Sequence, residues 1–385
     1  MAPCIRYFLN GKRHALDDTS NLSGFPWMQN PLETLEKNVI PLIRDEATAV
    51  DKNGQFPKKS IAALQGAGFF GLISAKDHGG AGFGPDVAAQ VIQKIAAECG
   101  SSAMVLAMHY AATAVIEKFG NSEARKKTAT TDLATLAFSE MGSRSHFWAP
   151  LGTATQSASG IKLDGHKSWV TSANHAVNYV WSAKPIKAEG ASSIFLVPRA
   201  SAGLKPGDSF DGLGLKGNDS TPVRAEGVTV PAENMLHADG AGLAVMLETV
   251  LPVFNLLNAA CSAGIMQGAV AAAIAHVTKI KHEHLGTALS DLQTIRSFIA
   301  QMQIETDKTK LLVADTAAAM LAGRADTMLR VLQSKAAAAE SAVKVTELAM
   351  RVCGGAAFRK ESGIERRFRD AHAAIVMAPT TDQLY

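Results

Sequence analysis

Cysteine is scarce in this sequence, and its few copies are widely separated. The four cysteines are Cys4, Cys99, Cys261 and Cys353, and no two of them form a C-x-x-C pair. Such spacing provides neither a zinc-finger ligand set nor a disulfide framework. We therefore expect a protein of a reducing compartment, the cytoplasm, and no metal site.

A strong excess of charge of either sign is also lacking. The chain has 38 Lys and Arg residues against 35 Asp and Glu residues, so its formal net charge is only +3. A protein that binds nucleic acid needs a marked basic excess to neutralise phosphates. We expect no nucleic-acid partner.

Uninterrupted apolar runs are too short to span a membrane, which takes about 20 residues. The most apolar stretch, residues 241–260, is interrupted by Glu248, Pro252, Asn255 and Asn258. Residues 1–18 contain no apolar core of the length that a secretory signal needs. We expect no membrane partner.

The chain of 385 residues is long enough for two or three domains. Changes in the pattern of apolar and turn-forming residues divide it into an N-terminal extension (1–30), a helical domain (31–134), a middle β-domain (135–239) and a C-terminal helical bundle (240–385). In the β-domain, short runs such as Ile161–Leu163, Ser168–Thr171 and Ser193–Val197 alternate with turn signals such as Asp164-Gly165. This spacing predicts a small barrel or sandwich, and the fold class is an α+β multidomain protein.

The outer domains show long helical patterns. Pro85–Glu98 and Ser101–Phe119 carry almost no charge in their centres, which is typical of buried helices. Thr294–Ala322 and Arg324–Cys353 contain neither Gly nor Pro, and helices of this length pack as an antiparallel bundle. Leu256–Val277 is apolar almost all round, so we expect it to be central or to bury a face in a subunit contact.

Three segments rich in Gly, Ser and Thr fall at the junctions between domains: Ala137–Ser145, Ser168–Asn174 and Cys353–Ala357. Glycine and short hydroxyl side chains let backbone N–H groups approach a planar or phosphorylated ligand. Each segment also has a plainer explanation, namely a tight turn, a core tryptophan and a helix C-cap. Both explanations stay open on spacing alone, because the sequence contains no G-x-S-x-G elbow, Walker A loop or G-x-G-x-x-G after a strand.

Seven segments in the same order and spacing make the chain resemble the flavin-dependent acyl-CoA dehydrogenase superfamily from Leu32 to Tyr385. Phe138–Ser145 stands where the family has T-E-P-x-x-G-S-D, and Gly165–Ala173 matches G-x-K-x-(W/F)-I-T-N-(A/G). The other segments are Asp77–Gly82, Leu213–Ser220, Val230–Leu236, Arg351–Gly355 and Glu365–Ala371. The resemblance implies an N-terminal helical domain, a central β-domain and a C-terminal four-helix bundle.

The resemblance also implies FAD, held between the β-domain and the bundle and partly by a second subunit, and hence a homodimer or homotetramer. The resemblance implies that ten positions contact FAD: Leu136, Phe138, Ser139, Trp169, Thr171, Arg351, Gly354, Gly355, Thr380 and Asp382. The first five would surround the isoalloxazine ring, and the next three would meet the dinucleotide of the neighbouring subunit. Ser145 falls where a serine of the family contacts acyl-CoA.

The sequence departs from this family at the catalytic base. The typical member uses a glutamate to remove the α-proton of an acyl thioester while hydride leaves the β-carbon. Ala378 stands at that position, and Phe254 stands at the alternative position on the first bundle helix, followed by Asn255 in place of an arginine. Neither alanine nor phenylalanine can accept a proton.

Three functions therefore stay open. The first is dehydrogenation of acyl-CoA or a related small substrate, with an electron acceptor as partner and a relocated base among His109, His146, Glu140 and Asp382. The second is a monooxygenase on the same fold, which receives reduced FMN or FAD from a flavin reductase and does not need the glutamate. The third is a non-catalytic flavin-binding subunit. We expect Ser145, His109 and Phe254 to meet the substrate.

Overall fold

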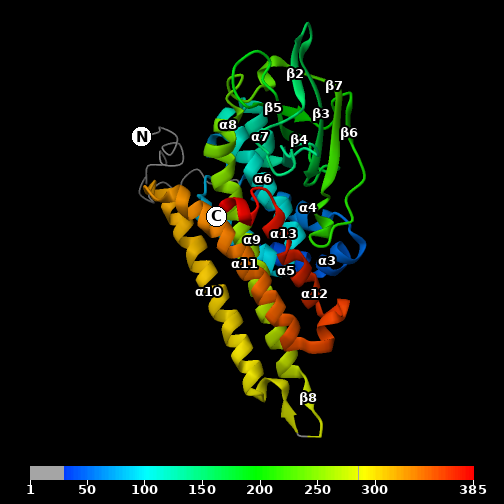
Figure 1. Cartoon of the computed structure of the whole chain (residues 1–385), viewed down its shortest axis with the longest axis vertical. Coiled ribbons are helices and arrows are strands. Elements are labelled where there is room, and N and C mark those ends of the chain that lie inside the picture. Colours follow the sequence, from blue (N-terminus) through cyan, green and yellow to red (C-terminus); the bar gives the residue numbers. More distant parts are fainter. Residues whose placement is uncertain (1–29, 285) are drawn as a thin grey trace.

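The computed structural model describes residues 30–284 and 286–385, so the expected N-terminal extension lies outside the described residues except for Asn30. Three parts follow one another along the chain: a set of helices, two small sheets, and a long helical bundle that extends away from the sheets (Figure 1). This arrangement confirms the expected fold class.

The first part is helical throughout. Its helices are α2 (Pro31–Thr34), α3 (Ile40–Asn53), α4 (Lys58–Gly66), α5 (Pro85–Glu98), α6 (Gly100–Phe119) and α7 (Ser122–Thr130). Proline stands in the first turn of α5, where the missing N–H leaves no hydrogen bond unmade. Almost every residue of α6 up to Ile116 is buried, because the helix is apolar on all sides.

The middle part is a sandwich of two sheets. The first sheet has the order β1-β4-β5, with β1 (Ala134–Ala137) parallel to β4 (Asn178–Ala183) and β5 (Ser193–Pro198) antiparallel to β4. The second is antiparallel, in the order β2 (Thr153–Ser157), β3 (Gly160–Val170), β7 (Thr221–Val230) and β6 (Leu204–Pro206). Tyr179, Trp181 and Phe195 of the first sheet share one buried core with Leu163 and Val223 of the second.

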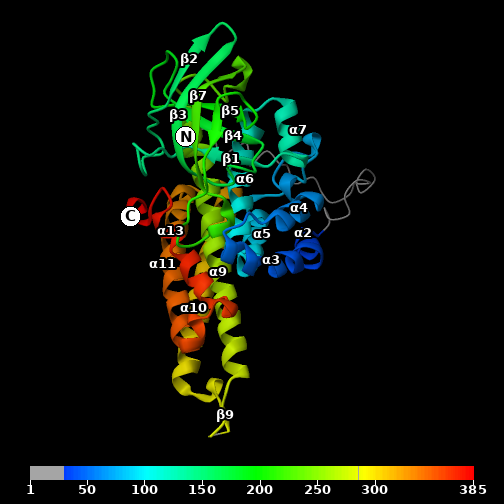
Figure 2. The ribbon, with the colours of Figure 1, turned by 90° about the vertical axis from the view of Figure 1, so that its right-hand side faces the viewer.

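The bundle is built on three long helices that lie side by side below the sheets (Figure 2). The long helices are α9 (Leu251–Lys279, continuous with α8, Gly242–Val245), α10 (Gln293–Ala322) and α11 (Thr327–Cys353). A small hairpin, β8 (Lys281–His282) and β9 (Thr287–Ala288), connects α9 to α10, and the chain closes with α12 (Ile364–Ala371), α13 (Ala373–Val376) and α14 (Thr381–Leu384). The shorter α12 packs against both α9 and α11 as the fourth helix.

Two π-helical turns, Leu35–Val39 and Met246–Val250, each stand just before a proline inside a helix. The prolines are Pro41 and Pro252, and a proline ring clashes with the carbonyl four residues earlier. A hydrogen bond that reaches five residues back, such as Leu251 N–H to the Met246 carbonyl, widens the turn and accommodates the ring. The second π-turn leads directly to Phe254.

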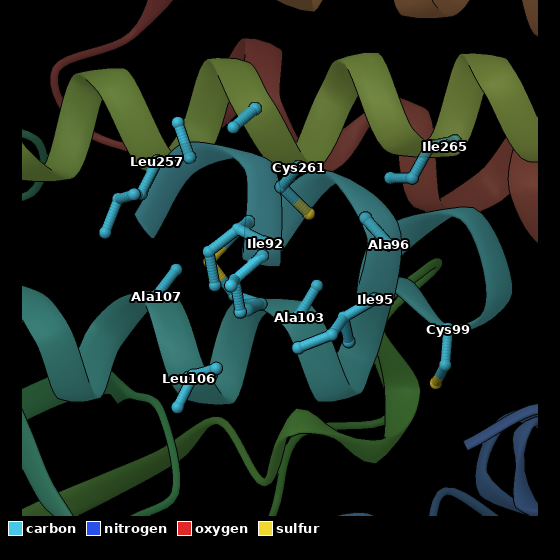
Figure 3. Close-up of a cluster of buried hydrophobic side chains, with 14 of the residues drawn as sticks. Ile92, Ile95, Ala96, Cys99, Ala103, Leu106, Ala107, Leu257, Cys261 and Ile265 are labelled. Carbon is cyan, nitrogen blue, oxygen red and sulfur yellow. The ribbon is translucent and has the colours of Figure 1, made fainter. Parts of the chain in front are cut away.

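The main core lies where α9 crosses α5 and α6 (Figure 3). Ile92, Leu106, Leu257, Cys261 and Ile265 are among the buried side chains of this crossing. Among the described residues, the continuous helix Gly242–Lys279 is the one long and apolar enough to cross a membrane, but 67% of its most apolar window is buried inside the fold. Such burial is what a core helix shows.

The expected helices Pro85–Glu98 and Ser101–Phe119 agree with α5 and α6 to within one residue. The strands differ more from the expectation. Ile161–Leu163 and Ser168–Val170 belong to the single strand β3 rather than to two strands, and Thr171 follows β3. The expected turn at Asp164-Gly165 is a β-bulge, where the register with β7 shifts and Asp164 Oδ1 accepts the Gly227 N–H at 2.7 Å. Such a bulge kinks a strand without ending it.

Close approach of α9 to α5 gives a first prediction. A Cβ atom on Gly264 would lie 2.2 Å from the Gln93 carbonyl oxygen, so Gly264→Ala must push the two helices apart. We expect a loss of roughly 2 kcal/mol or more in the free energy of unfolding. In the control Gly66→Ala, nothing lies within 4 Å of the new methyl group, and helix propensity should add roughly 0.5–1 kcal/mol. Urea denaturation measures both, and equal effects would contradict the close-packed crossing.

Candidate active site

A hydrophobic cluster fills the place where the sheets meet the bundle. We call it the junction cluster and use these members: Leu136, Phe138, Phe147, Trp148, Phe254, Met377 and Ala378. They come from β1 and the residue after it, from the loop that follows, from the start of α9 and from the turn after α13. The fold thus gathers segments that are up to 242 residues apart in sequence (378 − 136).

Both positions that the resemblance associates with a catalytic acid lie in this cluster. Phe254 is buried on α9, and Ala378 packs against the same group of side chains from the turn after α13. Leu136 and Phe138, expected beside the isoalloxazine ring, are members too. The structure therefore brings the expected ring-lining and base positions together and surrounds them with apolar side chains.

An exposed tryptophan flanks the cluster at a bulge of β3. Trp169 has a left-handed backbone, with φ 57°, and is 59% exposed, while its ring lies 4.3 Å from that of Phe210. The backbone N–H of Ser168 donates to the Ser139 carbonyl at 2.8 Å, and Thr135 Oγ1 donates to the Thr171 carbonyl at 2.7 Å. The two segments expected around the isoalloxazine ring consequently run side by side.

These two segments fit the flat ring of FAD. A large aromatic side chain that stays exposed in a strained backbone conformation is typical of a ligand site. Trp169 is exposed, and the neighbouring strand β1 contains Leu136 and is followed by Phe138 and Ser139. Trp169, Thr171 and Ser139 are the residues that would hold the ring.

The other positions expected at FAD lie elsewhere in the chain. Gly354 and Gly355 follow α11 in the part of the bundle remote from the sheets (Figures 1 and 2), and a Cβ atom on either would have nothing within 4 Å. Arg351 lies on the same stretch, with its guanidinium 4.4 Å from the centre of the Phe298 ring. One chain therefore does not place these residues beside Trp169.

Glu140 holds the loop that carries Phe147 and Trp148. Its carboxylate accepts the N–H groups of Leu151 at 2.6 Å and Gly152 at 3.1 Å and contacts Lys167 Nζ at 2.7 Å. Both charged side chains are almost fully buried. Burial lowers the pKa of Lys167, and the adjacent Glu140 carboxylate opposes that shift. Because its carboxylate oxygens are engaged in these contacts, Glu140 holds the loop in place.

His109 is a fully buried residue of α6 with both ring nitrogens engaged. Nδ1 accepts the backbone N–H of Ala134 at 3.1 Å, so Nε2 carries the proton and donates to the Phe70 carbonyl at 3.1 Å. Burial lowers the pKa of His109 to about 4, which keeps the imidazole neutral. Neither nitrogen is free to accept a proton from a substrate.

The exposed loop between Glu140 and Leu151 carries the remaining candidates. Arg144 takes a left-handed backbone, with φ 51°, which turns the chain before Ser145. Ser145 Oγ accepts a hydrogen bond from Gln383 Nε2 at 3.2 Å. The exposed His146 stacks on Trp148 of the junction cluster, with ring centroids 4.9 Å apart.

Thr380 and Asp382 lie in the last turn of the chain. Thr380 caps α14 by accepting the N–H of Gln383, and Asp382 is exposed in the first turn of that helix. Together with the Gln383–Ser145 contact, this places the C-terminal segment against the loop. Of the four candidate bases, His146 and Asp382 remain accessible.

A groove of about 340 Å³ is lined in part by the two ends of the same loop. Met141, Leu151, Thr153, Asp164 and His166 line much of it. It contains none of the junction-cluster residues. The groove is therefore separate from the candidate site.

Lys335 is a functional neighbour that the sequence analysis missed. Its Nζ donates to the carbonyls of Ala374, Met377 and Pro379 at 3.0, 3.1 and 2.7 Å, and no water reaches it. Burial lowers the pKa of Lys335 to about 8. The side chain fixes the turn that carries Ala378, and its only signal in the sequence is a single charge within an otherwise alanine-rich stretch of α11.

Comparisons with known proteins match one family over almost the whole described chain. The family models for the N-terminal, middle and C-terminal domains of acyl-CoA dehydrogenase match residues 32–134, 135–228 and 240–382. The probable acyl-CoA dehydrogenase fadE25 of Mycobacterium leprae is 27% identical over 343 residues, covering 87% of this chain and 86% of that protein.

Solved structures share the fold. Butyryl-CoA dehydrogenase from Megasphaera elsdenii has a TM-score of 0.84 at 21% identity and covers 100% of this chain and 96% of its own. The prolyl acyl carrier protein oxidase AnaB has a TM-score of 0.83 at 19% identity, with coverage of 92% and 97%.

His109 gives a prediction about pH. The unfolded chain binds a proton on His109 below about pH 6.5, whereas the folded chain binds it only below about pH 4, so its contribution to stability is lost across that window. We expect the advantage of wild type over His109→Gln in free energy of unfolding to shrink by about 3 kcal/mol between pH 7 and pH 4.

Burial raises the pKa of Asp370 to about 6, so its titration changes the free energy of unfolding in the opposite sense over the same pH range. Both proteins contain Asp370, so the difference between wild type and His109→Gln isolates the effect of His109. Urea denaturation at a series of pH values measures it, with the exposed His284→Gln as control. A difference that stays constant with pH would contradict a neutral buried His109.

Proposed function

Because this chain belongs to the acyl-CoA dehydrogenase family, we propose that it oxidises the acyl moiety of a thioester, with His146 as proton acceptor in place of the missing glutamate. Members of the family are oxidoreductases acting on CH–CH donors, and this chain is an FAD-dependent enzyme of that kind. The substrate class and the base are the proposed elements.

The junction cluster supports an acyl substrate. The acyl group would lie against Phe254 and Ala378, which present only hydrocarbon. Trp169 and Thr171 would hold FAD beside it, and FAD, when bound, supplies the acceptor for two electrons. The apolar walls exclude water, which strengthens every polar contact that the thioester makes.

The stacking of His146 on Trp148 is the observation that carries the choice of base. Trp148 packs against the junction cluster, so the imidazole stands at the edge of the site on the loop that also carries Ser145. Glu140 and His109 have their polar atoms engaged, as described above. An imidazole nitrogen of His146 would take the α-proton, and the β-hydrogen would leave with its electron pair.

We also propose a second copy of the chain as partner. The end of α11 and the segment after it lie in the part of the bundle away from the sheets (Figures 1 and 2). They carry Arg351, Gly354 and Gly355, which would therefore reach a bound dinucleotide only across a subunit contact. The carrier of the acyl group is coenzyme A or a related thioester carrier, as the names of butyryl-CoA dehydrogenase and prolyl acyl carrier protein oxidase indicate for those proteins. An external electron acceptor completes the cycle.

Anaerobic reduction tests this function. Acyl-CoA substrates from butyryl to palmitoyl should bleach the oxidised flavin absorbance of the holoenzyme, and His146→Ala should slow the bleaching by about 100-fold or more. His166→Ala, on the separate groove, is the control and should bleach at the wild-type rate. Unchanged bleaching in His146→Ala would exclude His146 as the base, and no bleaching by any thioester would exclude the dehydrogenase.

One observation favours a second function. The positions expected for an acid are occupied by Phe254 and Ala378, and a monooxygenase that receives reduced flavin from a reductase does not need that acid. Incorporation of isotopically labelled oxygen into a product, after mixing the reduced holoprotein with oxygen and substrate, would establish this function. A protein that keeps FAD but shows neither activity would be a non-catalytic subunit.

A further inference from the structure

Two buried asparagines of α9 have amide atoms without hydrogen-bond partners. Among the described residues, Asn255 is the one amide side chain whose nitrogen and oxygen both lack a hydrogen bond, and Oδ1 of Asn258 lacks one as well. Asn255 is fully buried and Asn258 almost fully. An unsatisfied buried polar group costs about 1–3 kcal/mol, so such a pair calls for a partner.

The two side chains stand beside the junction cluster. Asn255 follows Phe254 directly, and Asn258 comes three residues later, so the two asparagines lie about one helical turn apart. Nδ2 of Asn258 contacts Sδ of Met377 at 3.3 Å, and Met377 packs on the junction cluster next to Ala378. The unpaired amides thus border the place proposed for the acyl group.

Met377 is a weak and movable partner. A thioether sulfur accepts hydrogen bonds poorly, and the unbranched methionine side chain changes rotamer easily. A ligand group that both accepts and donates would displace the sulfur from Nδ2 of Asn258 and would donate to the free asparagine oxygens. Entry of a polar group here gains hydrogen bonds that the unliganded protein leaves unmade.

The buried cation nearest to Met377 offers no hydrogen bond to an anionic ligand group. Lys335 is the buried cation that holds the turn of Met377, and its ammonium donates to three backbone carbonyls. It has no further N–H to offer. The two free asparagine oxygens would repel a carboxylate, whereas a neutral group that both donates and accepts matches the pair.

We propose that Asn255 and Asn258 form a recognition pair for a neutral hydrogen-bonding group, a carboxamide or hydroxyl, on the acyl moiety of the substrate. This inference rests on the proposed function, because it assigns the kind of acyl group that the same site accepts. It makes the two asparagines determinants of specificity and leaves the proton transfer to another residue.

Three acyl-CoA thioesters of nearly the same shape test the pair. Succinamoyl-CoA carries a terminal carboxamide, 4-methylpentanoyl-CoA replaces it with an isopropyl group, and succinyl-CoA replaces it with a carboxylate. Calorimetric titration of the oxidised holoenzyme under anaerobic conditions measures each dissociation constant. We expect succinamoyl-CoA to bind about tenfold more tightly than either of the other two thioesters.

Asn255→Leu and Asn258→Leu keep the side-chain size and remove the amide. Each should abolish the preference, so that 4-methylpentanoyl-CoA binds at least as tightly as succinamoyl-CoA. Ser262→Ala removes another buried polar group of the same helix and is the matched control, which should keep the wild-type ratio. Thermal unfolding of each variant shows whether it is folded.

The outcomes separate the two proposals. If the thioesters bind but wild type shows no preference for the carboxamide, or if the leucine variants keep it, the recognition pair is wrong and the proposed function stands. If none of the three thioesters binds, the proposed function fails and the recognition pair fails with it.

Discussion

Burial of α9 on every side from Val253 to Met266 is the constraint on which the rest of the structure depends. From Leu251 to Ala275 this helix carries no charged residue, so water cannot cover any of its faces favourably. Helices α5, α6, α10 and α11 all pack on it. Gly264 and Gly268 allow the backbone of α5 to approach closely, and this fixes the height of α9 against the sheets. That packing sets the place of Phe254, near the first turn of α9, within the junction cluster.

Buried charges in this protein hold backbone in place. Glu140 and Lys167 bind the start and end of one loop, and Lys335 binds the turn after α13. Removing one partner of such a contact strands an uncompensated charge or leaves several carbonyls unpaired, which costs several kcal/mol. Substitution of these groups is therefore costly. The backbone around the junction cluster is held in place, while the side chains that line the cluster can differ from the family pattern. That division explains how an apolar lining can replace an acidic one without loss of the fold.

Periodicity was enough to predict the elements whose burial is uniform. Helices α5 and α6 are apolar throughout, so their limits follow from charge and proline alone. The bulge at Asp164 was not predictable, because Asp-Gly is a turn signal unless a distant N–H, here that of Gly227, engages the carboxylate. The role of Lys335 was hidden for the same reason, since its acceptors lie about 40 residues away. Resemblance supplied the expected ring-lining positions, whereas the contacts that engage Glu140 and His109 and leave His146 and Asp382 accessible needed coordinates.

The two departures at the active site form one electrostatic change. The resemblance places a glutamate at Ala378 and an arginine at Asn255, and both positions are neutral here. A buried charge without a partner costs several kcal/mol. Replacing both keeps the site neutral. A site without either charged group offers no charged partner within the apolar lining, so under the proposed function the proton would leave toward the exposed loop that carries His146. It also favours substrates that carry no charge of their own near α9.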